Sequence, residues 1–241
     1  MRISAMVMAG GRGTRMRASK IDTPKPLVRV ADTSVLAHNV AALLHHGVRD
    51  LHVSTSDPQV TAEAQGACTT QAVAAGGTLT VHVEHSPLGN MGAAGLLHGR
   101  CDALMVVFAD NLTALDLGAM LRHHAATRPA ATLATHVHRV PVPYGALEVT
   151  AGQVQRYTEK PRLPVVVSSG VYVWGPAALA WLAGHAPAGA SAVVSEMLEA
   201  GQRVEAFAHD APWIDINDAT AIDRAEALLE AHPAAFTWTS P

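Results

Sequence analysis

Two short segments of this chain are almost wholly apolar. Residues 3–8 read ISAMVM and residues 103–109 read ALMVVFA, and neither contains a charged side chain. A strand has this composition when both faces of its sheet are covered, because neither face then meets water. The two segments therefore predict buried strands of a parallel sheet.

Helical and strand patterns alternate along the first half of the chain. The helix expected at residues 35–47 has an apolar stripe and a terminal glycine, and Asp57-Pro58 is a typical helix start. Such alternation predicts a Rossmann-like α/β fold, in which a mostly parallel mixed sheet carries helices on both faces. The expected strands are 3–8, 50–55, 78–84, 103–109 and 131–137, and the expected helices are 35–47, one from Pro58, and about 115–125.

The pattern changes after about residue 140. Short strands are expected in GALEVT, QVQRYTEKP and VVVSSGVYVW, with a turn at Ala151-Gly152 between the first two. Helices return at 176–183, 190–200 and 218–231. Since no Gly- or Ser-rich linker and no repeat is present, residues 1–241 are predicted to form one domain: a part from 1 to about 140, a small β-rich elaboration over about 141–232, and a tail at 233–241.

Composition excludes several classes of protein. With 49% hydrophobic and 15% charged residues, the chain can build a core and is not expected to be disordered. A net charge of -3 argues against nucleic-acid binding, and no apolar run reaches the roughly 18 residues of a membrane span. Cys68 and Cys101 are too few for a disulfide framework, so a cytoplasmic location is expected. The pairs His45-His46 and His123-His124 are expected on solvated surface near helix ends.

A glycine-rich loop follows the first strand, and residues 6–27 read MVMAGGRGTRMRASKIDTPKPL. It is no P-loop, because no lysine stands at the required spacing, and Met16 and the two prolines are incompatible with a dinucleotide fingerprint. Glycines let backbone N–H groups close on an anion, and Arg15 and Lys25 can clamp a polyphosphate from two sides. A tight turn with surface basic residues stays open at this point.

The segments AGGRGTRM (9–16) and TPKPL (23–27) together resemble the signature of the sugar-1-phosphate nucleotidyltransferases, or nucleotide-sugar pyrophosphorylases. The mannose-1-phosphate guanylyltransferase-like members are the ones most resembled. The resemblance covers nearly the whole chain and makes 1–140 the nucleotide-binding part and 141–232 the sugar-phosphate-binding part. It implies catalytic roles for Arg15, Lys25 and Asp110. It implies nucleotide contacts at Ala9, Gly10, Gly11, Gly13, Thr14, Arg15, Glu84, Pro87 and Gly89.

Three further landmarks of the family have counterparts here. Residues 84–92, EHSPLGNMG, resemble the base-reading segment, with Asn90 and Met91 departing from the usual pattern. Asp110, after VVFA, and Asp215, in WIDIN, resemble the pair that holds Mg²⁺. The sugar-phosphate contacts implied by the resemblance are Tyr144, Gly145, Glu159, Lys160 and Ser169.

The resemblance implies condensation of an NTP with a sugar 1-phosphate, which gives an NDP-sugar and pyrophosphate, an EC 2.7.7 type of reaction that depends on Mg²⁺. It favours GTP among the nucleotides and leaves a homodimer open. Two alternatives stay open, and departures such as Ala109, Asn90 and Asn217 allow the first of them. One is a cytidylyltransferase acting on a non-sugar phosphate or phosphonate, and the other is a catalytically silent sensor of nucleotide sugars.

Overall fold

The computed structural model describes residues 1–10 and 23–239, and within them the predicted α/β fold is confirmed. The central sheet has seven strands in the order β12-β8-β11-β6-β1-β4-β5. Parallel pairing joins β6, β1, β4 and β5, and also β12 and β8, while β11 runs antiparallel to β6 and β8. The bounds are β1 (Ile3–Met8), β4 (Asp50–Thr55), β5 (Thr78–Val83), β6 (Ala103–Phe108), β8 (Ala131–Pro141), β11 (Arg162–Trp174) and β12 (Val204–Ala208).

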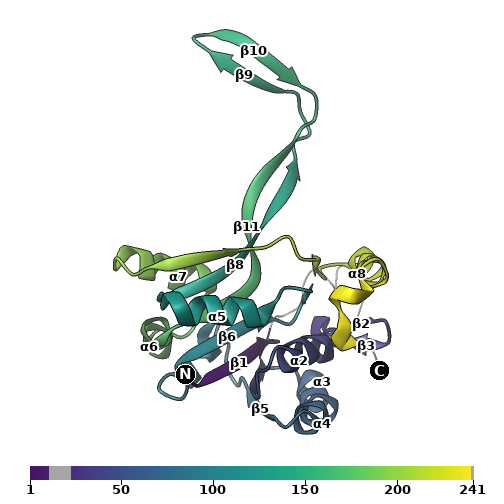
Figure 1. The fold of residues 1–241 in the computed structure, drawn as a ribbon, viewed down its shortest axis with the longest axis vertical. Helices are drawn as coiled ribbons and strands as arrows, with labels where there is room; N and C mark the ends of the chain where they lie inside the picture. Colours follow the sequence, from purple (N-terminus) through teal and green to yellow (C-terminus); the bar gives the residue numbers. More distant parts are fainter. Residues whose placement is uncertain (11–22, 240–241) are drawn as a thin grey trace.

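Helices cover both faces of this sheet (Figure 1). Short polar side chains cap several of them: Asp57 accepts from the first turn of α3, and Asp218 from that of α8. A short π-helical turn at Ala64–Cys68 joins α3 to α4. The helices are α2 (Val35–His45), α3 (Pro58–Glu63), α4 (Thr69–Ala74), α5 (Leu117–Thr127), α6 (Pro176–Gly184), α7 (Ala190–Glu199) and α8 (Ala219–Ala231).

The apolar strand β1 separates two cores. Ala5 and Val7 pack into the cluster with α2 and α5, whereas Met6 and Met8 pack into the cluster with α6 and α7. Complete burial of a side chain such as Met6 contributes about 1.5–3 kcal/mol. Successive side chains of β1 thus enter two different cores, which explains why residues 3–8 are apolar at nearly every position.

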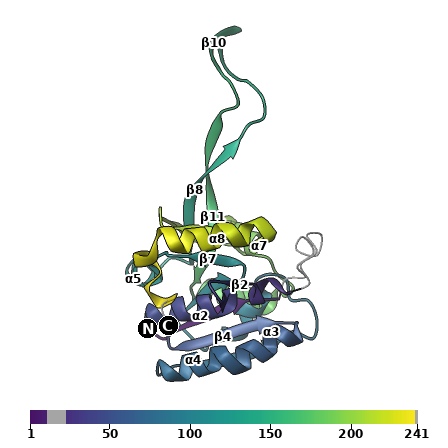
Figure 2. The same ribbon diagram turned by 90° about the vertical axis from the view of Figure 1, so that its right-hand side faces the viewer.

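A two-stranded ribbon projects from this body (Figures 1 and 2). Its stem is formed by the distal halves of β8 and β11, and its end by the hairpin of β9 (Ala146–Thr150) and β10 (Gln153–Thr158). The predicted turn is confirmed: Ala151 and Gly152 both have positive φ, 50° and 79°, as a tight two-residue hairpin turn requires. We call residues 137–167 the arm.

Two features of the fold lie at the positions where the sequence analysis divides the chain. The chain passes residue 140 inside β8, and β11 returns to the central sheet, so no boundary in the fold coincides with that position. The residues expected to form a tail include Phe236, which is 1% exposed and packs with α8 in a third core. The segment 233–241 contains two aromatic residues, Phe236 and Trp238, without a periodic pattern, which is why the sequence did not indicate that it packs.

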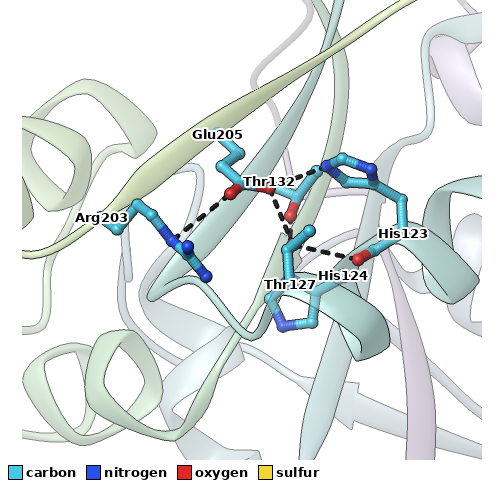
Figure 3. Close-up of polar contacts among 6 residues, drawn as sticks. All are labelled: His123, His124, Thr127, Thr132, Arg203 and Glu205. Atoms are coloured by element: carbon cyan, nitrogen blue, oxygen red, sulfur yellow. Dashed lines mark hydrogen bonds and ion pairs between the residues drawn. The ribbon is translucent and has the colours of Figure 1, made fainter.

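Figure 3 shows how helix α5 is joined to the edge strand β12. Glu205 accepts a hydrogen bond from Thr127 (2.8 Å), contacts His123 Nε2 at 2.8 Å and forms an ion pair with Arg203 at 3.3 Å. The expected surface position of the histidine pair is wrong for His124, which is buried, hydrogen-bonds with Thr132 Oγ1 at 2.8 Å, and has a pKa lowered by burial.

Among the described residues, no helix combines the length and the apolar character that crossing a bilayer requires.

Candidate active site

A cavity of about 510 Å³ opens at the carboxyl edge of the sheet, beyond β1 and β6. Ligands bind at this edge in open α/β sheets, because the loops that leave the strands surround it. Of the residues implied for the nucleotide, the cavity includes Ala9, Gly10, Glu84, Pro87 and Gly89, together with Lys25 and Asp110. Gly11, Gly13, Thr14 and Arg15 lie outside the described residues.

Glu84 is held at the wall of this cavity. Its Oε1 accepts a hydrogen bond from Ser54 at 2.6 Å, and its backbone N–H donates to Thr55. A Cβ on Gly10 would lie 2.9 Å from the same Oε1, so glycine allows the first strand's end and Glu84 to approach. Ser54 was not singled out from the sequence, because a lone serine in a strand carries no motif.

The loop of residues 84–92 is fixed by the segment before α7. Met91 N–H donates to Ala188 O, and Ala188 N–H donates to Leu88 O. Gly89 has φ +77°, and a Cβ there would lie 2.3 Å from Ala188 O. Asn90, a departure from the family pattern, accepts from the backbone N–H of Ala190 at 3.0 Å and so secures the start of α7.

The two aspartates implied for metal binding lie on neighbouring short strands. Asp110 directly precedes β7 (Asn111–Thr113), and Asp215 ends β13 (Trp213–Asp215), where it stands opposite Asn111. Ile216 N–H also donates to Asp110 O at 2.8 Å. The fold thus brings together two residues more than one hundred positions apart in the chain.

Lys25 connects these aspartates through a polar network. Its Nζ lies 3.3 Å from Asp110 Oδ2 and 2.7 Å from Asn217 Oδ1, and Asn217 Nδ2 donates to Asp215 Oδ2. The Lys25 side chain is 16% exposed, so the charge is partly withdrawn from water and its attraction to an anion is weakly screened. Asn217 is a departure from the pattern that the sequence resembles, and its hydrogen bond to Lys25 was not predicted.

The donor set suits a hard divalent cation. Asp110 and Asp215 offer carboxylate oxygens, which Mg²⁺ prefers, usually with substrate phosphates and waters completing its octahedron. Within residues 1–10 and 23–239, no cluster of three or more His, Cys, Asp or Glu side chains could enclose a metal alone. A bound cation here would therefore share its coordination with the substrate.

A second cavity, of about 770 Å³, lies on the Asp215 side of the network at the base of the arm. Its walls include His136 and His209, whose ring nitrogens lie 2.9 and 2.7 Å from Ser169 Oγ. Burial is the largest cause that lowers the pKa of both histidines. Sequence reasoning missed both, because they are separated by more than seventy residues and belong to no motif.

The residues implied for the sugar phosphate are not gathered at either cavity. Ser169 is fully buried between the two histidines, and its carbonyl accepts from Asn111 and Trp213. The other four, Tyr144, Gly145, Glu159 and Lys160, lie on the arm, where the lysine and glutamate are 69% and 61% exposed. None of the five is among the walls of the first cavity.

Comparison with known proteins defines the class. The chain matches the family described as nucleotidyl transferase over residues 4–232, and it therefore belongs to that family.

Two curated relatives illustrate the similarity. The mannose-1-phosphate guanylyltransferase catalytic subunit beta of Xenopus tropicalis is 30% identical over 185 residues, which are 73% of this chain and 51% of the relative. Mannose-1-phosphate guanylyltransferase 1 of Arabidopsis thaliana is 28% identical over 187 residues, with the same coverage. The chain spans about half the length of these curated relatives.

Solved structures share the fold at low sequence identity. A putative glucose-1-phosphate thymidylyltransferase from Bacillus anthracis, in complex with a sucrose, superposes with a TM-score of 0.72 and 19% identity, covering 94% of both chains. HddC from Yersinia pseudotuberculosis, solved also as a complex with GMP-PN, has a TM-score of 0.68 and 19% identity, covering 94% of this chain and 99% of the other.

Proposed function

We propose that this chain transfers a nucleotidyl group from an NTP to a sugar 1-phosphate and releases pyrophosphate. The observation that carries the proposal is the network of Lys25, Asp110, Asn217 and Asp215, which stands between the two cavities. It combines one cation with two carboxylates at the mouth of the sheet. A reaction between two phosphates needs a positive charge to offset their repulsion and carboxylates to hold a metal ion.

We assign the first cavity to the nucleotide and the side of Asp215 to the acceptor. The loop of residues 84–92 borders the first cavity, and its glycines leave room for backbone groups to contact a base edge. Arg15, with Gly11, Gly13 and Thr14, would hold the triphosphate. For the acceptor, the contacts proposed from the sequence resemblance are Tyr144, Gly145, Glu159 and Lys160 on the arm, and Ser169, which is buried behind His136 and His209 of the second cavity.

The chemistry follows from charge. An oxygen of the acceptor phosphate attacks the α-phosphorus, the bond from that phosphorus to the bridging oxygen of the β-phosphate breaks, and pyrophosphate leaves. The attacking oxygen is already ionised near neutral pH, so no general base is required. Two unit charges at 4 Å repel by about 4 kcal/mol at an effective dielectric of about 20, and this repulsion is what the site has to offset.

We assign Lys25 and Arg15 to negative charge at different positions of the reacting phosphates. Lys25, which contacts Asp110 and Asn217, would stabilise the charge that develops at the α-phosphorus. Arg15 would stabilise the departing pyrophosphate. Asp110 and Asp215 would hold Mg²⁺, whose charge would offset that of the phosphate oxygens. Catalysis is then positioning and electrostatic stabilisation.

For the substrates we propose GTP and a hexose 1-phosphate such as mannose 1-phosphate. The curated relatives are mannose-1-phosphate guanylyltransferases by name, and HddC has been solved with GMP-PN.

Mass spectrometry after incubation with each NTP and a panel of phosphates tests the proposal. Formation of a GDP-sugar and equimolar pyrophosphate is the expected result. CDP adducts of non-sugar phosphates or phosphonates would instead identify a cytidylyltransferase. Absence of product with every pair would favour a silent sensor, and binding of nucleotide sugars without turnover would then be the measurement to make.

A further inference from the structure

The hydroxyl group of Ser169 is shared by two histidines that line the second cavity. Nδ1 of His136 lies 2.9 Å from Ser169 Oγ, and Nε2 of His209 lies 2.7 Å from the same oxygen. Ser169 is fully buried, whereas both rings belong to the cavity wall. The serine that the sequence resemblance implies for the acceptor therefore lies behind the two rings, and its hydroxyl can influence a ligand only through them.

One hydroxyl between two ring nitrogens restricts the tautomers of the two histidines. A serine hydroxyl has a single hydrogen, so it donates to one neutral ring and accepts from the other. Nδ1 of His209 is buried and lacks a hydrogen bond of ordinary geometry within the described residues. Burial lowers the pKa of His209, and the nearby carbonyl of Ala211 opposes that shift. Since a carbonyl oxygen favours an N–H beside it, we assign the hydrogen of His209 to Nδ1, and its Nε2 then accepts from Ser169.

This arrangement decides what His136 presents to the cavity. Its Nδ1–H donates to Ser169, so its Nε2 carries a lone pair and is a hydrogen-bond acceptor. The two nitrogens of an imidazole point in nearly opposite directions. Because Nδ1 points to a fully buried hydroxyl, Nε2 points away from the core, on the side of the cavity that His136 lines.

The plane of the His136 ring is also held in place. Its centroid lies 4.5 Å from that of the Trp213 ring, with 39° between the two planes, and Trp213 Nε1 donates to the backbone carbonyl of Ser169 at 2.8 Å. Both rings are thus attached to the same buried serine. An acceptor that is fixed in this way loses little conformational entropy when a ligand binds.

The other walls of the second cavity indicate which ligand chemistry suits it. Its charged side chains, among the described residues, are Asp210, Asp215, Asp218 and Arg224, and Arg224 lies 3.9 Å from Asp218. Carboxylates and an imidazole lone pair all accept hydrogen bonds. This wall therefore suits the hydroxyl groups of an uncharged polyol, while a phosphate is better placed near the cation of Lys25.

We propose that His136 contacts the acceptor through Nε2, which accepts a hydrogen bond from a hydroxyl group of the sugar. Ser169 and His209 are positioning residues, because they hold the tautomer in which that nitrogen carries a lone pair. The inference deepens the proposed function and rests on it for the identity of the ligand, a hexose 1-phosphate. Its hydroxyl groups lie in the second cavity and its phosphate lies on the side of Lys25.

The first measurement is the tautomer of His136, which needs no activity. Long-range proton–nitrogen correlation spectra report both ring nitrogens, and the signals lost in His136→Phe identify this ring among the 14 histidines. At pH 7.5 the ring is neutral, since burial lowers the pKa of His136. We expect a hydrogen on Nδ1 and none on Nε2. Ser169→Ala should shift the ring towards the Nε2–H tautomer, which free histidine prefers.

The second measurement separates the KM for the sugar phosphate from kcat, with mannose 1-phosphate and GTP as the substrates. His136→Phe keeps a planar ring without nitrogens, so the KM for mannose 1-phosphate should rise about tenfold, as expected for one lost hydrogen bond. The kcat and the KM for GTP should stay within about threefold of the wild type, because the contact is made before and during the reaction alike. His136→Gln, whose side-chain oxygen can accept from a hydroxyl, should recover most of the loss.

His185→Phe is the matched control. His185 also stacks on a tryptophan, with 4.4 Å between its centroid and that of Trp181, and its Nδ1 lies 2.7 Å from the backbone carbonyl of Trp181. It lines neither of the two cavities described above. His185→Phe should therefore leave the KM for mannose 1-phosphate within about threefold of the wild type.

Three results would overturn the proposal. One is a hydrogen on Nε2 of His136 in the wild-type protein. Another is a KM for the sugar phosphate that His136→Phe raises less than threefold, and the third is an equal rise in His136→Phe and His136→Gln, which would mean that ring shape matters and the acceptor does not. If wild-type protein forms no NDP-sugar, the proposed function fails together with this inference, whereas NDP-sugar formation with an unchanged KM in His136→Phe refutes the inference alone.

Discussion

The loop of residues 84–92 and the arm both extend from the carboxyl edge of the sheet, and both contain glycines with positive φ. The loop is fixed by backbone hydrogen bonds to Ala188 and by a close approach at Gly89. The arm is held only by its own ladder, and nothing lies within 4 Å of a Cβ placed on Gly152. A defined cavity forms where a connection is packed on both sides, and an exposed ribbon where it is not.

Metal removal is expected to have the largest effect on turnover, and it should act on the body of the molecule and not on the arm. Because Asp110 and Asp215 belong to the body, chelation should stop pyrophosphate release without altering the arm. Excess EDTA should reduce turnover to background, and added Mg²⁺ should restore it, since phosphate charge is then neutralised again. Continuous measurement of released pyrophosphate provides the readout. Undiminished release in EDTA would remove the proposed metal role of both aspartates.

The next largest effect on kcat is expected from removing the Lys25 side chain at the first cavity. Lys25→Ala should lower kcat by roughly 10²- to 10³-fold, as expected for removal of a preorganised charge near the reacting phosphorus. Arg29→Ala removes a nearby charge whose hydrogen bond, among the described residues, is to the backbone of Asp32, and it should change kcat less than about threefold. Steady-state kinetics with saturating NTP decide the matter. A loss below about threefold for Lys25→Ala would contradict its assignment.

The two glycines compare loop and arm directly. Gly89→Ala should lower the free energy of unfolding by about 3 kcal/mol or more, because it adds a clash with Ala188 O to the strain of a positive φ. Gly152→Ala has nearly the same φ and no clash, so about 1 kcal/mol is expected. Urea denaturation measures both. Equal losses would mean that the loop is no better packed than the arm.

A lower pH should decrease the free energy of unfolding, through histidines of the body. Burial lowers the pKa of six histidines, all in the body or at the base of the arm: His38, His46, His82, His124, His136 and His209. Below about 6.5 the unfolded chain therefore binds more protons than the folded chain, and the free energy of unfolding falls as the pH drops towards the lowered values. Urea denaturation at pH 7.5, 6.5 and 5.5 should show this decrease, and a constant free energy of unfolding would contradict it.

The smallest effect is expected at the contact between α5 and β12. Thr127→Val keeps the side-chain shape but removes the hydrogen bonds to Glu205 and to the backbone of His123, so about 1 kcal/mol should be lost. Thr70→Val should lose less, because the Thr70 hydroxyl donates to the exposed backbone carbonyl of Gly66 in its own helical segment. Thermal unfolding distinguishes the two variants.

The sequence determined most strands of the central sheet, although not β12, and most of the helices, because these depend on local patterns. An apolar run such as residues 103–109 requires cover on both faces of the sheet, and the sequence alone is enough to show it. The position of Asp110 after its strand was also enough to place it at the mouth of the sheet.

Only the tertiary structure decided which distant groups meet. Asn217 joins Lys25, Ser54 holds Glu84, and His136 and His209 enclose Ser169, although no spacing in the chain links these partners. The direction in which the arm projects could not be predicted from the sequence either. Alternating strands with a tight turn predict a hairpin, but whether that hairpin lies on the body or projects from it depends on surfaces that exist only once the chain has folded.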